Sequence, residues 1–175
     1  HPVLIDRFLE DAVEIDVDAV CDGKDVLLGP IMEHVEEAGV HPGDSTTVIP
    51  TQNVSPEVLR TLDDYTRRIA LALDTRGLIN IQFAVQGKTV YVLEANPRSS
   101  RTVPYVAKAT GLPLAKIAAK VAIGRTLRQL HATAPARLKH VAVKAPVFPF
   151  LKLPGVHAVL GPARKSPVEV MGIGD

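Results

Sequence analysis

The sequence predicts an α+β domain in which a mainly antiparallel sheet is flanked by helices. Two pairs of apolar runs, each joined by a short glycine-containing segment, are typical of β-hairpins. One amphipathic segment with helical spacing lies between them, and short helical segments follow the second pair. At 175 residues the chain is long enough to form one domain with a substantial core.

The N-terminal part of the chain is predicted to form strands. Val3–Leu9 is expected as a first short strand. Apolar and acidic residues alternate from Val13 to Val20, which is typical of a half-buried strand. A turn at Asp22–Lys24 then leads into a partner strand over Val26–Met32. We expect a solvated face for the acids of the alternating strand, Glu14, Asp16 and Asp18.

A loop and a helix are predicted next. Glu33–Ser45 is polar and contains two glycines and a proline, so we expect a loop there. Ser55-Pro56-Glu57 supplies an N-cap, a proline at the first helical position and an acid in the first turn. Apolar residues recur at helical spacing from Val58 to Leu73, and Gly77 is expected to end this helix.

The C-terminal third is predicted to form three short helices, one strand and a loop-rich tail. The expected helices and strand are Val103–Ala109, Pro113–Ile123, Thr126–Leu130 and Val141–Val147. Phe148–Asp175 is rich in proline and glycine and is therefore expected to be mostly loop. We divide the chain into a core over residues 1–147 and an extension over residues 148–175.

The most informative stretch is the second hairpin, within Gly77–Arg101. Strand side chains alternate between faces, so Glu94 and Asn96 at its end point the same way. A three-residue loop, Gly87–Thr89, would place Gln82 opposite Glu94, whereas a two-residue loop would place Gln82 opposite Leu93. We expect the three-residue loop, because it gathers the polar side chains on one face.

These side chains have the chemistry of a metal–nucleotide site. Carboxylate and amide oxygens are ligands for hard cations, and Mg²⁺ usually takes one or two carboxylates together with phosphate oxygens. Arg98 and Arg101, just beyond the strand, offer forked donors for phosphate or carboxylate. The alternative is an exposed hairpin face that is polar without having a function.

The stretch resembles the metal-binding core of ATP-grasp enzymes. The resemblance rests on Gln82 and on Glu94-Ala95-Asn96-Pro97-Arg98. Motifs along the rest of the chain are similar to the C-terminal half of the carbamoyl-phosphate synthetase large subunit: Glu14–Asp18, Met32–His34, Gly39–Ser45, Arg101–Pro104, Lys108–Gly111 and Ala115–Ala118. The fold implied is the C-terminal ATP-grasp subdomain, and the extension would lead toward the next domain of the parent protein.

The resemblance also implies roles for individual residues. The residues that would contact ATP are Arg7, Leu9, Glu14, Gly39, Val40, His41, Pro42, Gln82 and Glu94. Two Mg²⁺ or Mn²⁺ ions would be held by Gln82, Glu94 and Asn96, while Arg98 and Arg101 would be catalytic. Pro42 stands where the family commonly has a hydroxyl residue, and it has no N–H to donate. A monovalent cation such as K⁺ would be held by Glu14, His34, Glu36, Val40 and Ser45.

The reaction implied is the phosphorylation of carbamate by ATP to carbamoyl phosphate, for arginine and pyrimidine biosynthesis. The parent subunit would work with a glutaminase small subunit. No glycine-rich phosphate loop occurs in the sequence, so we expect half of the nucleotide site and no activity from this piece alone. The alternatives are another ATP-grasp ligase, or an inert module acting only as a scaffold.

Composition excludes some other classes of function. Twenty Lys and Arg balance 19 Asp and Glu without a basic block, which argues against nucleic-acid binding. No apolar run approaches the ~20 residues of a membrane span. The one cysteine, Cys21, cannot form an internal disulfide and is expected to be buried. These features are those expected of a cytoplasmic protein.

Overall fold

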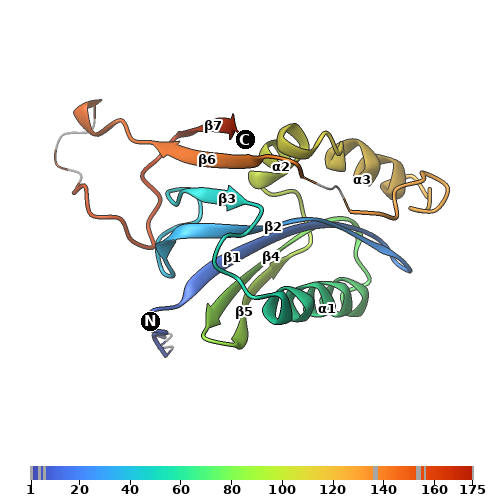
Figure 1. The fold of residues 1–175 in the computed structure, drawn as a ribbon, viewed down its shortest axis with the longest axis horizontal. Coiled ribbons are helices and arrows are strands. Elements are labelled where there is room, and N and C mark those ends of the chain that lie inside the picture. Colours follow the sequence, from blue (N-terminus) through green and yellow to red (C-terminus); the bar gives the residue numbers. More distant parts are fainter. Residues whose placement is uncertain are drawn as a thin grey trace.

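The computed structural model describes residues 2–3, 5, 7–135, 138–152, 155 and 157–174. These residues form one seven-stranded sheet with the order β5-β4-β1-β2-β3-β6-β7, in which every neighbouring pair is antiparallel (Figure 1). The strands are β1 (Val13–Asp22), β2 (Val26–Glu37), β3 (Thr47–Ile49), β4 (Arg76–Gln86), β5 (Thr89–Asn96), β6 (Val141–Val147) and β7 (Val168–Gly174). The predicted α+β class with a mainly antiparallel sheet is therefore confirmed.

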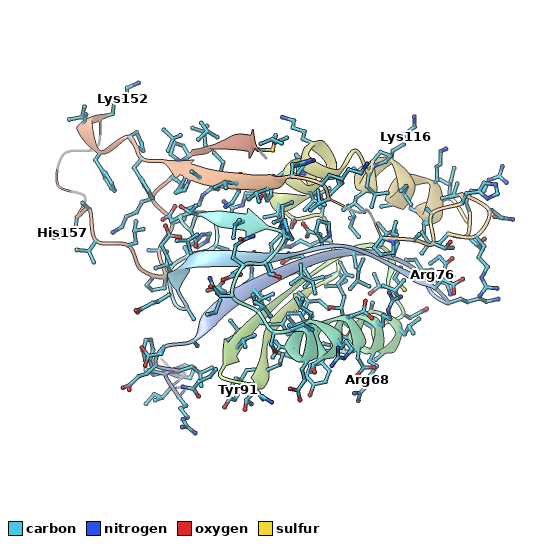
Figure 2. The ribbon with its side chains drawn as sticks, in the orientation of Figure 1. Arg68, Arg76, Tyr91, Lys116, Lys152 and His157 are labelled. Atoms are coloured by element: carbon cyan, nitrogen blue, oxygen red, sulfur yellow. The ribbon has the colours of Figure 1, made fainter. Side chains whose placement is uncertain are left out.

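Helices cover both faces of the sheet. α1 (Pro56–Ala72) lies on one face, whereas α2 (Thr102–Thr110) and α3 (Leu114–Ala122) lie on the other (Figure 1). The face under α1 is lined by apolar side chains that alternate along the strands, such as Val17 and Ile81. Outward charges such as Arg68 on α1 and Lys116 on α3 extend away from the ribbon (Figure 2). Within the described ranges, no helix is both long and apolar enough to cross a bilayer.

The face under α2 and α3 is only partly apolar. Val20 of β1 packs into the core cluster beneath these helices. Asp18 and Asp16 lie two and four residues before Val20 on β1 and therefore project from the same face. The second face therefore has an apolar part under the helices and a polar part next to it, where the site lies.

Local sequence signals account for several element ends. The β1–β2 turn contains Gly23 at φ 87°, and the carboxylate of Asp22 accepts from the N–H groups of Lys24 and Asp25. The hydroxyl of Ser55 caps α1 by accepting from the N–H of Val58 at 3.3 Å. Gly111 ends α2 in the left-handed conformation that glycine adopts readily.

Some predicted boundaries are wrong. Of the predicted strand Val3–Leu9, residues 4 and 6 lie outside the described residues, and the described residues there form no strand. The predicted loop from Glu33 begins too early, because β2 continues to Glu37 by pairing with β1 and β3. Gly77 lies within β4 and does not end the helix, which stops at Ala72.

Two predictions for the C-terminal third also need correction. Thr126–Leu130 makes a single turn and no helix, because the chain leaves helical geometry at His131, where φ is 52°. The extension after Phe148 contains β7, which the expectation of mainly loop omitted. Residues 153, 154, 156 and 175 of the extension lie outside the described residues.

Candidate functional site

Two rows of polar side chains cross the strands β1, β4 and β5. Directly opposite residues in antiparallel strands share a face. One row is formed by Asp16, Gln82 and Glu94, and the other by Asp18, Asn80 and Asn96. The rows are adjacent on the face that also carries α2 and α3.

The hairpin reaches this arrangement by a different route from the predicted one. Gln86 pairs with Thr89, so the connection has two residues and the expected three-residue loop is wrong. A bulge further along the hairpin places Phe83 opposite Val92 and Gln82 opposite Glu94, which leaves Leu93 as the extra residue. The predicted pairing of Gln82 with Glu94 is therefore confirmed, because the bulge compensates for the shorter loop.

The predicted metal ligands lie together at the end of this hairpin. The amide nitrogen of Asn96 donates to a carboxylate oxygen of Glu94 at 2.7 Å, which confirms that the two side chains point the same way. Gln82 is half-buried beside them, and Glu94 is exposed. Among the described residues no group of three His, Cys, Asp or Glu side chains could hold a metal. One carboxylate and two amides fit Mg²⁺ or Mn²⁺ when phosphate oxygens complete the ligand set.

The acids of β1 are buried, so the predicted solvated face is wrong. Glu14, Asp16 and Asp18 are 4%, 2% and 0% exposed. Asp16 accepts from the amide of Asn80 at 3.2 Å and lies 3.1 Å from Nε2 of His34. These partners allow a carboxylate to be buried where an isolated one would be very costly.

Asp18 holds the segment that carries the two arginines. Its carboxylate accepts from Asn80 Nδ2 (3.0 Å), Ser100 Oγ (2.7 Å) and Thr102 Oγ1 (2.6 Å). Burial raises the pKa of Asp18 to about 6, even though these donors favour the ionised form. Ser100 and Thr102 flank Arg101 in sequence, so Asp18 fixes the backbone from which this arginine projects.

A cavity of about 270 Å³ lies over these rows. Its lining includes six of the predicted site residues: His41, Pro42, Gln82, Glu94, Arg98 and Arg101. It also includes residues that were not predicted: Asp16, Gly43, Asn80, Ser100, Thr102, Lys144 and Glu169. The structure thus brings the hairpin, the segment before α2 and the loop after β2 around one space.

The other predicted site residues do not line the cavity. They are Arg7, Leu9, Glu14, Gly39, Val40 and Asn96. Arg7 is exposed and Leu9 is half-buried. Burial raises the pKa of the Glu14 carboxyl, while charge on His34 and a hydrogen bond from the Gly39 backbone act in the opposite direction. Glu14 thus lies beside the loop that begins at Gly39.

Arg98 and Arg101 have no carboxylate partner within 4.0 Å among the described residues. Both are exposed, and Arg98 Nη1 donates to the carbonyl of Ser99 at 3.1 Å. An unpaired guanidinium beside a cavity is available for an anion. The cavity therefore has oxygen ligands on the β4–β5 side and cationic groups on the side where α2 begins.

The loop after β2 is held by the extension. The backbone N–H of His41 donates to Gly161 at 2.8 Å, and the hydroxyl of Ser166 donates to the carbonyl of Gly43 at 2.7 Å. Asp44 accepts from the N–H groups of Lys165 and Ser166. Burial alone would raise the pKa of Asp44, but these hydrogen bonds outweigh it and the pKa is lowered. The extension thus fixes the loop against the cavity.

Two of the residues expected to hold a monovalent cation bind each other. A carboxylate oxygen of Glu36 accepts from Ser45 Oγ at 2.7 Å and from the N–H of Thr46 at 2.6 Å. His34 Nε2 is directed at Asp16, and its buried Nδ1 has no hydrogen-bond partner among the described residues. The structure therefore brings Glu36 and Ser45 together. The imidazole of His34 contacts Asp16 of β1 and neither of these two residues.

Signals for some of the missed residues were present in the sequence. Side chains two residues apart on a strand share a face. Asp16 is two residues after Glu14, and Asn80 is two residues before Gln82, so each lies beside a predicted site residue. No comparable signal marked Lys144 or Glu169. They reach the cavity only because β6 and β7 join the sheet at its far edge.

Replacing Gly43 by alanine is expected to lower turnover while leaving the free energy of unfolding within about 1 kcal/mol of wild type. An added Cβ would lie 2.9 Å from Arg164 Nε and 3.1 Å from Arg101 Nη1. Both neighbours are ends of flexible side chains, so they move and the backbone remains in place. Urea unfolding of the chain and turnover of the full-length protein would check this. A variant with unchanged turnover would show that the position of Arg101 is unimportant.

Known proteins match this chain over most of its length. The family "Carbamoyl-phosphate synthase L chain, ATP binding domain" matches residues 1–130. The carbamoyl phosphate synthase large chain of Archaeoglobus fulgidus is 63% identical over 172 residues, which cover 98% of this chain and 16% of that protein. That of Methanosarcina barkeri is 65% identical over 173 residues, which cover 99% of this chain and 44% of that protein. The chain thus spans less than half the length of these relatives.

Solved structures share the fold at lower identity. The biotin carboxylase domain of a single-chain bacterial carboxylase has a TM-score of 0.74 at 22% identity, over 95% of this chain and 44% of that chain. A single-chain, multi-domain long-chain acyl-CoA carboxylase has a TM-score of 0.65 at 22% identity, over 79% of this chain and 15% of that chain. At this identity the likeness shows the fold alone. The match over residues 1–130 and the identities above 60% show that the chain belongs to the family of carbamoyl-phosphate synthase large-chain ATP-binding domains.

Proposed function

We propose that this chain is the part of a carbamoyl phosphate synthase large chain that phosphorylates carbamate with ATP. An oxygen of carbamate forms a bond to the γ-phosphorus of ATP while the bond from that phosphorus to the β-phosphate oxygen breaks. The products are carbamoyl phosphate and ADP. Because carbamate is already an anion, the attacking oxygen has no proton to lose and no general base is required.

The observation that supports this best is the arrangement of opposite charges around the cavity. Gln82 and Glu94 contribute oxygen atoms to the cavity lining, and Asn96 contacts Glu94 from outside this lining. Arg98 and Arg101 lie on the side where α2 begins. Phosphoryl transfer depends mainly on positioning and on neutralising negative charge. Within this cavity, the first group would hold the metal–phosphate end of ATP and the second would hold the acceptor.

Each group has its own role in this proposal. Glu94, Gln82 and Asn96 would hold two Mg²⁺ or Mn²⁺ ions, which when bound neutralise charge on the phosphates of ATP. Arg98 and Arg101 would orient carbamate and stabilise the charge of the phosphoryl group in flight, an effect worth roughly 10³-fold or more for an arginine. His41 and Pro42 border the same cavity and would contact the nucleotide. The part of ATP that extends beyond the cavity lining would contact Arg7, Leu9, Glu14, Gly39 and Val40.

Family membership supports wider proposals without testing them. We propose that the full-length large chain works in the cytoplasm with a glutaminase small subunit, in arginine and pyrimidine synthesis. Glu14, His34, Glu36, Val40 and Ser45 would surround a K⁺ ion. This chain alone is expected to be inactive, because it contains no glycine-rich loop to cover the phosphates of ATP.

Another ATP-grasp ligase with a different acceptor is the alternative function. The matching carboxylase structures share this fold, and so the fold does not distinguish the acceptor. A scaffold without catalytic activity is the alternative outside the enzymes. It would leave Arg98 and Arg101, which line the cavity without a carboxylate partner among the described residues, without a role.

ATP synthesis from carbamoyl phosphate and MgADP tests the proposal. It is to be measured in a full-length large chain that carries this sequence, with acetyl phosphate as the comparison donor. We expect carbamoyl phosphate to be used and acetyl phosphate to be used much less. Absence of ATP synthesis from carbamoyl phosphate would refute the proposed acceptor, and nucleotide binding without any turnover would favour the scaffold.

A further inference from the structure

Lys144 is a buried cation on β6 whose position the proposed function does not explain. Its side chain is 2% exposed and lines the cavity. Nζ donates to the carbonyl oxygens of Pro42 at 3.2 Å and Ser45 at 3.0 Å. In the part of the chain that the structure describes, no carboxylate lies within 4.0 Å of this ammonium group.

The nearby acids are engaged elsewhere. The carboxylate of Glu169, which also lines the cavity, lies 3.9 Å from Arg164 Nη2. Asp44 accepts from the backbone of the extension, and Asp16 accepts from Asn80. Burial lowers the pKa of Lys144, while the charges of Glu169, Asp16, Glu36 and Asp44 act to raise it.

A buried ammonium group with incomplete pairing favours the binding of an anion. Lysine has three N–H donors, and two of those of Lys144 are used by carbonyl groups. Placing a charge in a protein interior is costly unless it is paired and hydrogen-bonded. The third donor has no acceptor among the described residues, and the space next to it is the cavity.

The cavity has a second feature that favours negative charge. α2 begins at Thr102, which lines the cavity, and no side chain among the described residues caps its first turn. The N-terminus of a helix carries partial positive charge and unpaired N–H groups. Arg98 and Arg101 lie beside it. Cationic groups from two separate parts of the fold thus face one space.

We propose that Lys144 binds the anionic acceptor, donating its third N–H to an oxygen of carbamate or of the carbamoyl group of the product. This inference rests on the proposed function and adds a residue that neither the motifs nor the family match assigned. It places the acceptor between β6 and the start of α2. The anion completes the pairing of Lys144, and Lys144 helps to exclude neutral acceptors.

The test compares Lys144→Gln and Lys144→Arg in the full-length large chain, using ATP synthesis from carbamoyl phosphate and MgADP. Glutamine keeps N–H donors at this position, but it has no charge. We expect Lys144→Gln to raise KM for carbamoyl phosphate roughly 10- to 100-fold, as for loss of a charged hydrogen bond. KM for MgADP should stay within about twofold, because the proposed contact of the third N–H is with the acceptor and not with the nucleotide. Lys144→Arg should recover part of the loss.

Tyr105→Phe is the matched control. The hydroxyl of Tyr105 donates to the carbonyls of Thr47 on β3 and Ala142 on β6. β6 also carries Lys144, but Tyr105 does not line the cavity. It should leave KM for carbamoyl phosphate unchanged. An unchanged KM in Lys144→Gln, or an equal rise of KM for both substrates, would overturn the role of Lys144. Absence of the reaction in wild type would instead refute the proposed function.

Discussion

Replacing Glu94 by glutamine in the full-length large chain is expected to lower ATP synthesis from carbamoyl phosphate and MgADP by roughly 10²- to 10³-fold. Glu94 is the only carboxylate among the three proposed metal ligands, so it supplies the charge that holds a divalent cation. Glutamine keeps the oxygen that accepts from Asn96, and it therefore preserves the shape of the hairpin end. Initial rates at saturating substrate would give the loss in kcat.

Nucleotide binding separates this effect from misfolding. Calorimetric titration with ADP without a divalent cation should give the same affinity for wild type and Glu94→Gln, because the loss concerns the metal. Glu57→Gln is the control, since Glu57 pairs with Lys88 of the same hairpin at 2.9 Å and lies away from the cavity. It should leave the rate unchanged. Near-normal rates in Glu94→Gln would mean that this hairpin is not the site of phosphoryl transfer.

The hairpin shows how far strand periodicity can predict a site. The two-residue period was enough to place Glu94 and Asn96 on one face. It did not give the loop length, because Val90–Leu93 is uniformly apolar and no residue in it marks the bulge. The loop and the bulge together restored the predicted pairing of Gln82 with Glu94. The chemistry of the hairpin was thus predictable while its backbone path was not.

The acids of β1 show where local pattern fails. Alternation of apolar and acidic residues is typical of a strand with one wet face. In this fold β1 is central, and the donors that allow Asp16 and Asp18 to be buried come from Asn80, Ser100 and Thr102. These partners are 62 to 84 residues away in sequence. Their approach depends on the tertiary structure, which no local window contains.

The far edge of the sheet was the least predictable part. β7 lies in a segment rich in glycine and proline, and it is a strand because β6 pairs with it along its whole length. The same pairing brings Glu169 beside the cavity, on the face that carries Lys144. Single lysines and glutamates on strands are common, so only their shared position distinguishes these two.

Replacing Asp18 by alanine is expected to lower the free energy of unfolding by about 2–4 kcal/mol. The substitution leaves the amide of Asn80 and the hydroxyls of Ser100 and Thr102 without their common acceptor. Asp18→Asn should cost much less, because an amide keeps one acceptor and both hydroxyls can also accept. Urea unfolding of the chain, with circular dichroism as the signal, would measure both variants.

The difference in unfolding free energy between Asp18→Asn and wild type is expected to change with pH in one direction. The pKa of Asp18 is raised from 3.8 to about 6 in the folded chain, so the folded state binds its proton more tightly than the unfolded state does. The stability that this proton contributes is fully present below pH 3.8 and is lost as pH rises through 6. The variant Asp18→Asn has no titrating group at this position and therefore no such loss. Its unfolding free energy relative to wild type should rise between about pH 4 and pH 6, and a constant difference would contradict the raised pKa.

Activity shows whether Asp18 also positions the arginines. If its hydrogen bonds fix the segment before α2, Asp18→Ala should lower kcat in the full-length large chain even at temperatures where the protein remains folded. Asp18→Asn should retain most of the activity, since it keeps a polar partner for Ser100 and Thr102. A destabilised Asp18→Ala variant with normal kcat would mean that Arg98 and Arg101 find their positions through substrate and not through Asp18. The acids of β1 would then stabilise the sheet only, and the oxygen ligands and cations around the cavity would be positioned independently of each other.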